Sequence, residues 1–280
     1  MIASAENQSA RQSGQRVARY RHLGELVDAL QASGRYTFRR EEALAALEVS
    51  AGAFTKAMRR LAAKQRIVAP RRGFFVVVPL EYRSAGAPPA SWFVDDLMTF
   101  HGRRYYVGLL SAAALHGAAH QQPQQFQVVT DRPLRPTVVG RSSIRFFYKR
   151  ELSSTPTAEI KTETGTLRTS TPEATAFDLV RYVAGAGNLN NVATVLAELA
   201  EVIDAERLVR AAAKGVELSV VQRTGFLLDL VGAAKVAKPL ALWVDHQRPR
   251  PALLRPDRPA VRLKSSVWRV IVNETVEVDV

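Results

Sequence analysis

The sequence predicts an α+β protein with an N-terminal winged helix-turn-helix domain and a larger mixed α/β C-terminal domain. Three observations support this prediction: short amphipathic helices followed by a basic hairpin, a Pro-rich stretch, and mixed strand and helix signals beyond it. We expect four segments along the chain: a disordered arm at 1–19, a winged helix-turn-helix at 20–82, a linker at 83–91 and the mixed domain at 92–280.

The composition is that of a globular protein. The 280 residues are 47% hydrophobic, enough for two domains with their own cores. The absence of cysteine excludes disulfides, thiolate nucleophiles and cysteine-ligated zinc. The sequence lacks both a run of about 20 apolar residues, which a membrane helix needs, and an N-terminal signal peptide. We therefore expect a cytoplasmic protein.

Positive charge is concentrated near the N-terminus. The formal net charge of the chain is +13, and residues 1–80 contain 14 Lys/Arg against 6 Asp/Glu, a net charge of +8. A field of this kind attracts polyanions, and nucleic acid is the commonest polyanion in a cytosol.

The helix predicted from Ser50 to Arg66 is the strongest functional signal in this region. Ser50 is a good N-cap, and Phe54, Met58 and Leu61 form an apolar stripe that can face a core. The opposite face has four cations and no carboxylate. We interpret it as a DNA-recognition helix, although an ordinary solvated basic face remains an alternative.

The elements before this helix complete a helix-turn-helix. A first helix runs from Leu23 to near Ser33, before Gly34, and Tyr36 to Phe38 is β-prone. A compact second helix spans Arg40 to Leu47, and the break from Glu48 to Ala51 is short enough for a tight helical pair.

A basic hairpin follows the helix and predicts a wing. Ile67-Val68 and Phe74 to Val78 are β-prone, and the Pro70 to Gly73 turn between them includes Arg71 and Arg72. The consistency of all these elements supports the winged helix-turn-helix more strongly than any one of them.

The predicted DNA contacts divide into three groups. Thr55, Lys56 and Arg59 lie nearest the base edges if the N-terminal half of the helix, capped by Ser50, enters the major groove. Arg39, Arg40, Arg60 and Lys64 are better placed for phosphates, and Arg71 and Arg72 for backbone or minor groove. A winged helix that binds only protein stays open as an alternative. The arginines of the arm, at 11, 16 and 19, could enter a minor groove, but we favour an arm that only increases solubility.

The C-terminal domain shows strands early and late, with helices between them. We expect helices over 92–100, from Ser111 to Gly117, from about 171 to 183, around 192–199 and 208, and over 219–231. Strands are expected at 126–130, 144–148 and 167–169, with two more in 268–280 around Asn273-Glu274. The helix near 171 begins either at a Ser170/Glu173 capping box or at a Thr171 cap with Pro172 in its first turn.

The enzyme-like motifs are weak. His116 and His120 have the i, i+4 spacing of a metal pair but lack the zincin glutamate, and Asp131 with Glu159-Ile160-Lys161 matches a nuclease pattern only loosely. Gly185-Ala186-Gly187 lacks the third glycine of a dinucleotide loop. We predict no enzyme activity, no catalytic residue, no metal and no cofactor.

Four segments, in this order, resemble the AbiEi-type antitoxins of type IV toxin–antitoxin systems: YYVGLLSAAALHG, TSTPEATAFDLV, VQRTGFLLDLVG and WRVIVNETVEVDV. With the basic winged helix and the Pro-rich linker, the resemblance covers about residues 20–280. The motifs are packing patterns rather than catalytic signatures, so their order and spacing indicate the family.

The resemblance implies a transcriptional autorepressor that is also an antitoxin. Proteins of this family bind operator inverted repeats through the N-terminal domain, and their C-terminal domain counteracts a nucleotidyltransferase-like toxin, with or without direct contact. The expected partners are therefore double-stranded DNA of its own operator and that toxin, with no membrane. Two alternatives stay open: a ligand-responsive winged-helix repressor whose C-terminal domain binds a small molecule or dimerises, and a nuclease that uses Asp131, Glu159 and Lys161.

Overall fold

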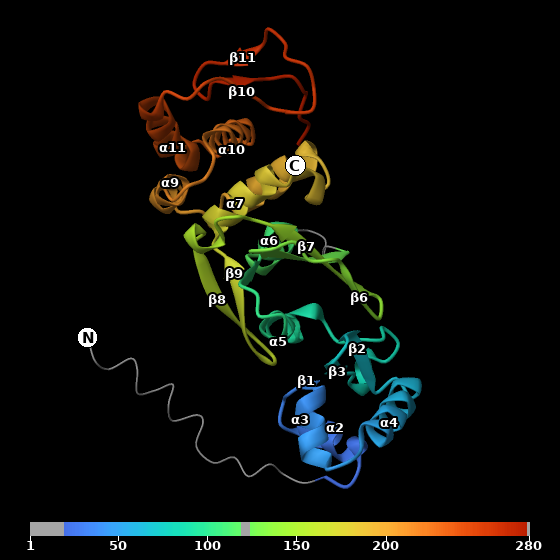
Figure 1. Cartoon of the computed structure of the whole chain (residues 1–280). Helices are drawn as coiled ribbons and strands as arrows, with labels where there is room; N and C mark the ends of the chain where they lie inside the picture. The colour runs from blue at the N-terminus through green and yellow to red at the C-terminus, as the bar shows by residue number, and fades with distance from the viewer. Residues whose placement is uncertain (1–19, 119–123, 279–280) are drawn as a thin grey trace, which may run out of the picture. The chain divides into compact units, whose positions relative to one another are not determined.

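The computed structural model describes residues 20–118 and 124–278 and shows a mixed α/β fold (Figure 1). The chain divides into two compact units, one of residues 1–89 and 139–141 and one of residues 90–138 and 142–280. We describe each unit by itself. The predicted disordered arm at 1–19 and His120 lie outside the described residues.

The first unit contains the three predicted helices, α2 (Leu23–Ala32), α3 (Arg40–Leu47) and α4 (Ala51–Ala63). The second predicted helix has the predicted bounds, and α4 begins at the predicted cap. Its end differs, because Gln65 adopts a left-handed backbone with a φ of 53° and the Arg66 N–H turns back to the Leu61 carbonyl. The helix therefore stops at Ala63 instead of Arg66.

A three-stranded sheet completes this unit. Strands β1 (Thr37–Arg39), β2 (Ile67–Arg71) and β3 (Phe74–Val77) pair antiparallel in the order β1-β3-β2. Phe38 stacks on Phe75 at 5.1 Å between ring centroids, and Phe54 of α4 meets Phe75 edge-on at 5.9 Å. These aromatic contacts join α4 to the sheet, which fixes the face that the helix turns outward.

The second unit is built on a six-stranded sheet in the order β6-β7-β5-β4-β9-β8. Its strands are β4 (Tyr105–Val107), β5 (Gln125–Thr130), β6 (Thr137–Val139), β7 (Ser142–Tyr148), β8 (Thr157–Thr162) and β9 (Gly165–Ser170). The sheet is mixed: β5 pairs parallel with β7 and antiparallel with β4, and β4 pairs parallel with β9. The predictions of β5, β7 and β9 are confirmed, whereas β4, β6 and β8 were missed.

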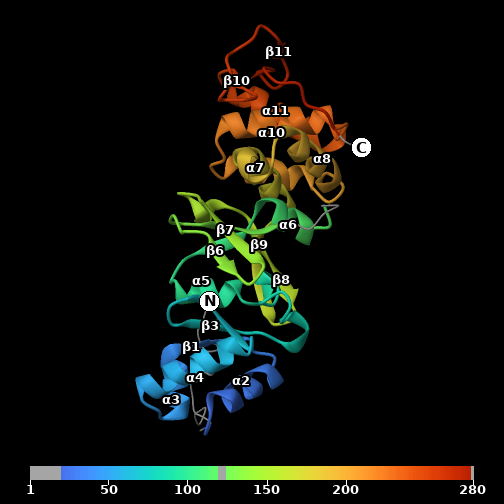
Figure 2. The same ribbon diagram turned by 90° about the vertical axis from the view of Figure 1, so that its right-hand side faces the viewer.

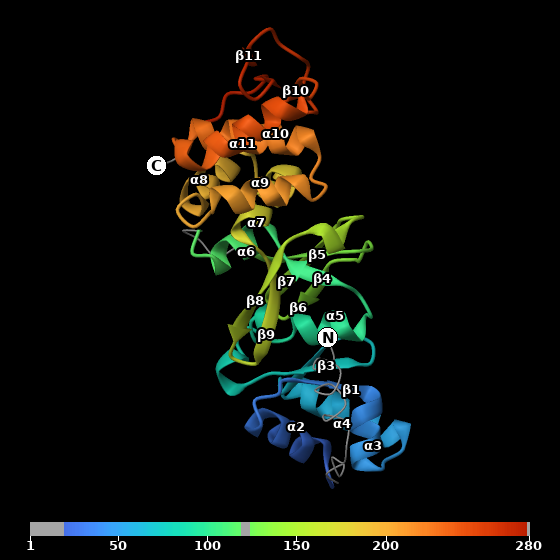
Figure 3. The ribbon, with the colours of Figure 1, turned by 90° about the vertical axis from the view of Figure 1, so that its left-hand side faces the viewer.

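Helices surround and extend this sheet in the second unit. They are α5 (Val94–Phe100), α6 (Leu109–Leu115), α7 (Pro172–Arg181), α8 (Leu189–Leu199), α9 (Ala205–Ala213), α10 (Leu218–Leu230) and α11 (Ala234–Gln247). Short 3₁₀ turns span Leu80–Tyr82, Ala90–Trp92, Leu152–Ser154 and Val183–Gly185. Within the second unit, α7 to α11 gather on one side of the sheet in the two side views (Figures 2 and 3).

Several element boundaries differ from the prediction for local reasons. The small-residue helix α6 begins at Leu109 rather than Ser111, and Gly117, with a φ of 82°, ends it as expected. Of the two starts considered for α7, Thr171 is the cap: its hydroxyl accepts the Ala174 N–H at 3.4 Å, with Pro172 first in the helix.

The C-terminal segment forms a small sheet of β10 (Ala252–Leu253), β11 (Lys264–Ser265) and β12 (Val270–Ile271), in the order β10-β12-β11. The prediction of two strands in 268–280 is wrong, because no strand follows β12 among residues 272–278. The partners of β12 come instead from 252–253 and 264–265.

Gly225 packs its bare Cα against the ring of Trp268, which is 1% exposed. A Cβ atom at this position would lie 2.0 Å from the ring. We therefore expect Gly225→Ala to lower the free energy of unfolding by about 1–3 kcal/mol through overpacking. Denaturant unfolding measures the change, with Leu242→Ala, at a 62% exposed position of the same unit, as the control. Unchanged stability in Gly225→Ala would show that the Trp268 ring can move away at little cost.

Candidate nucleic-acid interface

The orientation of α4 follows from its cap and its apolar stripe. The Ser50 hydroxyl accepts the Ala53 N–H at 3.2 Å and so starts the helix. Phe54 is 1% exposed and anchors the helix in the core of the unit, with Met58 and Leu61 packed beside it. The face opposite this stripe therefore points to solvent.

The cations on this outer face are unneutralised within the described part of the chain. Lys56, Arg59, Arg60 and Lys64 are exposed, and none of them takes part in an ion pair with another described residue. Their spacing of three, one and four residues places them together along one side of the helix. The nearest contact is weak, from Arg60 Nε to the Lys56 carbonyl at 3.5 Å. We call these four residues the α4 basic face.

Other predicted residues have structural contacts of their own. The Thr55 hydroxyl donates to the Ala51 carbonyl at 2.8 Å, so its oxygen remains available only as an acceptor. The Arg40 guanidinium lies over the Phe54 ring at 5.2 Å, a cation–π contact that holds α3 against α4. Arg39 is exposed at the start of α3, where its N–H donates to Glu42 Oε2 at 3.3 Å.

The turn between β2 and β3 presents the remaining predicted residues. Arg71 ends β2 and is half-buried, whereas Arg72 is exposed in the turn itself. Gly73 closes the turn with a φ of 89°, a conformation that favours glycine. All ten predicted residues therefore lie on α3, on α4, at the ends of these two helices or in the β2–β3 hairpin of one compact unit.

The second unit contains a buried charged cluster that the sequence did not reveal. Asp178 is fully buried on α7, and its carboxylate accepts from Lys149 Nζ at 3.0 Å and from the Tyr106 hydroxyl at 2.7 Å. Lys149 Nζ also donates to the Tyr106 oxygen at 3.2 Å. Burial, and then the negative charge of Asp178, raise the pKa of Tyr106 well above its ordinary value.

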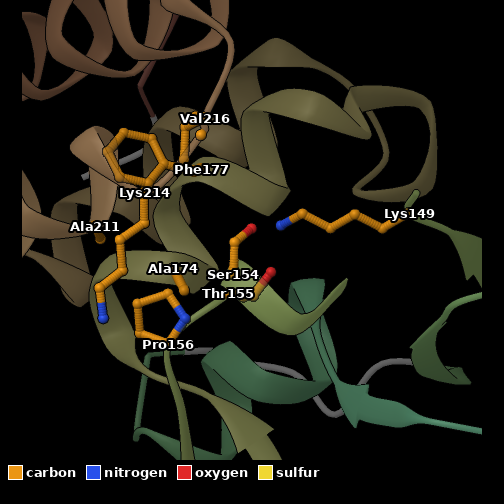
Figure 4. Close-up of a pocket in the computed structure, with 10 residues that line it drawn as sticks. Lys149, Ser154, Thr155, Pro156, Ala174, Phe177, Ala211, Lys214 and Val216 are labelled. Carbon is orange, nitrogen blue, oxygen red and sulfur yellow. The ribbon is translucent and has the colours of Figure 1, made fainter. Parts of the chain in front are cut away.

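A cavity beside this cluster is too small for a substrate. It measures about 10 Å³, room for one water, and Lys149, Ser154 and Thr155 line it from one side (Figure 4). The cluster is therefore a polar part of the core, which joins β4, the end of β7 and α7. The only sequence signal for it was a lone carboxylate within the apolar run Ala174 to Val180.

The weak enzyme motifs are separated in the structure. Asp131 is ion-paired with Arg104 at 3.6 Å, while Glu159 lies on β8 opposite Arg168 of β9. His116 Nε2 is 2.7 Å from the Ser170 carbonyl oxygen, a half-buried structural hydrogen bond. Within the residues that the structure describes, no three His, Asp or Glu side chains are close enough together to hold a metal ion.

The comparison with protein families finds a match for the central part of the second unit. Residues 106–230, from β4 to the end of α10, match the family model of the AbiEi antitoxin C-terminal domain. This part of the chain is similar to an AbiEi-type antitoxin domain. The resemblance predicted from the packing motifs is thereby confirmed, and the charged cluster of Tyr106, Lys149 and Asp178 lies inside this antitoxin domain. An antitoxin implies a toxin as its counterpart.

A solved structure supports the fold beyond the antitoxin domain. The chain is similar to the RV2827C protein from Mycobacterium tuberculosis, with a TM-score of 0.64 and 17% sequence identity. The similarity covers 88% of this chain and 89% of that one, so it extends through both units. No curated protein matches the chain. Among the described residues, no helix has the length and apolar character needed to cross a bilayer.

Proposed function

We propose that the protein is a cytoplasmic, sequence-specific DNA-binding autorepressor and the antitoxin of a type IV toxin–antitoxin operon. In this proposal residues 20–82 form the winged helix-turn-helix and 92–280 the antitoxin part. The observation that carries the DNA-binding half is the α4 basic face, whose four cations are exposed and without carboxylate partners among the described residues.

The topology of the first unit supports a winged helix-turn-helix. Its elements follow in the order α2-β1-α3-α4-β2-β3, with α3 and α4 separated by three residues. The second helix of such a pair enters the major groove in known complexes. We assign this role to α4 and the role of the wing to the β2–β3 hairpin.

The contacts to DNA follow from the position of each side chain. Lys56 and Arg59 lie on the N-terminal two-thirds of α4 and are assigned to base edges, where an arginine can bond guanine O6 and N7 together. Thr55 is assigned as an acceptor for a base amino group, since its proton is already donated. Arg39, Arg40, Arg60 and Lys64 are assigned to phosphates, Arg71 and Arg72 to backbone or minor groove, and Ser50 positions the helix.

The antitoxin half of the proposal rests on the family match of residues 106–230. We infer a nucleotidyltransferase-like toxin as the counterpart, counteracted with or without direct contact, and operator inverted repeats as the DNA target. The antitoxin part itself is proposed to be non-enzymatic.

One experiment tests both halves with the full-length chain. The protein is co-expressed with the neighbouring gene and with a reporter driven by its own upstream DNA. We expect rescue of growth and repression of the reporter, and we expect Lys56→Ala/Arg59→Ala to lose at least tenfold of the repression while it keeps the rescue. A harmless neighbouring gene would contradict the antitoxin role, and unaltered repression by the double variant would contradict the DNA interface.

A further inference from the structure

The second unit contains an open groove of about 450 Å³, a volume typical of small-molecule sites. Its walls come from four places: β7, the end of α7 with the following 3₁₀ turn, α10, and the loop after β10. Each of these places contributes one arginine, namely Arg145, Arg181, Arg223 and Arg255. We call it the arginine groove.

Two of these arginines are neutralised and two are not. Arg181 is ion-paired with Glu217, and Arg255 with Asp257 and with Glu274, the latter at 3.1 Å. Arg145 and Arg223 take part in no ion pair with another described residue. The positive charges of Arg145 and Arg223 are therefore not neutralised by an ion pair within the described part of the chain.

Arg223 is held in place without an ion pair to another described residue. Its Nε donates to the Leu253 carbonyl at 3.0 Å, and it is half-buried on α10. Burial lowers the pKa of Arg223 below its ordinary value, with Glu217 opposing this effect. A partly desolvated guanidinium whose only hydrogen-bond partner among the described residues is one carbonyl favours an anionic ligand.

An unpaired arginine nitrogen and a helix end add positive character to the residues that line the groove. Arg181 Nε is buried and has no hydrogen-bond partner among the described atoms. The groove is also lined by Gly187 and Asn188, which start α8, and Asn188 accepts the Asn191 N–H at 2.9 Å as its cap. The N-terminal end of an eleven-residue helix adds partial positive charge to that wall.

The apolar part of the wall consists of aromatic rings. Phe147 and Tyr182 pack with ring centroids 5.3 Å apart, and the Arg145 guanidinium lies over Phe147 at 5.0 Å. Both rings line the groove beside the arginines. A site lined by arginine and not by lysine is typical of phosphate binding, because the planar guanidinium can donate two parallel hydrogen bonds to a phosphate group. Aromatic side chains add a surface on which a planar ring of the ligand can stack.

We propose that the arginine groove binds a phosphate-bearing ligand of mononucleotide size, with Arg145 and Arg223 as its principal phosphate contacts. The ligand is a free nucleotide or the 5′-phosphorylated end of an RNA, which share this chemistry. Three of the four arginines lie within the antitoxin domain, so the site would make that domain responsive to a ligand. The inference does not depend on DNA binding by the first unit.

The test is calorimetric titration of the full-length protein. The probes are inorganic phosphate, pyrophosphate, ATP, GTP, and a trinucleotide RNA with or without a 5′-phosphate. We expect the nucleotides or the 5′-phosphorylated RNA to bind at least tenfold more tightly than inorganic phosphate. Binding of only the 5′-phosphorylated RNA identifies an RNA end, and binding of the nucleotides identifies a free ligand.

Matched variants locate the site. Arg223→Ala and Arg145→Ala are each expected to weaken binding by about tenfold or more, as loss of a hydrogen bond to a charged group does. Arg262→Ala removes an exposed arginine outside the groove and is expected to change affinity less than twofold. If Arg223→Ala fails to fold by circular dichroism, Arg145→Ala decides, because its contact is only with the Phe147 ring.

Three results would overturn the proposal. The first is no binding of any probe at millimolar concentration. The second is equal weakening by Arg262→Ala, which would show diffuse attraction to the basic surface. The third is retention of full affinity by Arg145→Ala and by a folded Arg223→Ala.

Discussion

Asp178→Ala is expected to destabilise the antitoxin domain by about 3–5 kcal/mol, because it leaves Lys149 as a buried charge with no counter-ion. The Lys149 side chain is 11% exposed, Asp178 is fully buried and the adjoining cavity has room for a single water, so bulk water cannot replace the lost carboxylate. The Tyr106 hydroxyl would also lose the acceptor that it now reaches at 2.7 Å. Guanidinium unfolding followed by circular dichroism gives the change.

Two further variants make this prediction specific. Asp245→Ala removes an exposed carboxylate that lies 3.8 Å from Arg269, and it is expected to cost less than about 1 kcal/mol, as surface ion pairs do. Lys149→Met/Asp178→Leu removes both charges and is expected to recover much of the loss. Equal stability of Asp178→Ala and Asp245→Ala would mean that Lys149 reaches water when its partner is removed.

Arg59→Ala is expected to weaken operator binding by about 1–3 kcal/mol, roughly 5- to 150-fold, and to relax the preference for one base. Arg60→Ala, assigned to phosphate, is expected to weaken binding to all sequences evenly and to reduce the slope of log affinity against log salt by about 1. Fluorescence anisotropy with the upstream DNA and with scrambled DNA, over a range of salt concentrations, separates the two effects.

The matched control for this series is Arg207→Ala. Arg207 is an exposed arginine on α9 of the other unit, and its loss is expected to leave affinity unchanged. If Arg59→Ala and Arg207→Ala bind equally well, α4 is not the element that contacts DNA. If binding is insensitive to salt, the basic face is not the source of the affinity.

The first unit could be predicted in detail because α2 and α4 each have an apolar stripe and the strands are short β-prone runs next to turn residues. In α2, Leu23, Leu26, Val27 and Leu30 are all buried, as their spacing indicates. The one clear error, the end of α4, came from Gln65 entering the left-handed region, which the sequence did not signal.

The second unit was harder to predict because several strands lack a hydrophobic pattern. Strand β8 is exposed along most of its length at the edge of the sheet, so its Glu159-Ile160-Lys161 segment gave a spurious metal motif. Strand β4 has only three residues and passes almost directly into α6. Helix α11 was not predicted, and it contains Pro239, a residue that ordinarily interrupts a helix.

The candidate sites also differ in how far the sequence could predict them. The α4 basic face is a local pattern on one helix, so the sequence alone indicated it. The arginine groove joins residues 145, 181, 223 and 255, which only the tertiary fold brings together. Asp178 and Lys149 likewise come from separate elements, and neither has a sequence neighbour that indicates its partner.

The position of β4 in the six-stranded sheet also limits how the antitoxin domain can assemble during synthesis. Val107 of β4 pairs with Thr169 of β9, whereas β8 and β9 form a hairpin with a two-residue turn. The hairpin can therefore form as soon as it leaves the ribosome, while the middle of the sheet stays open until about sixty more residues have followed β4. Until then the inner edge of β4 is an unpaired strand edge, which a chaperone or a neighbouring nascent chain could engage.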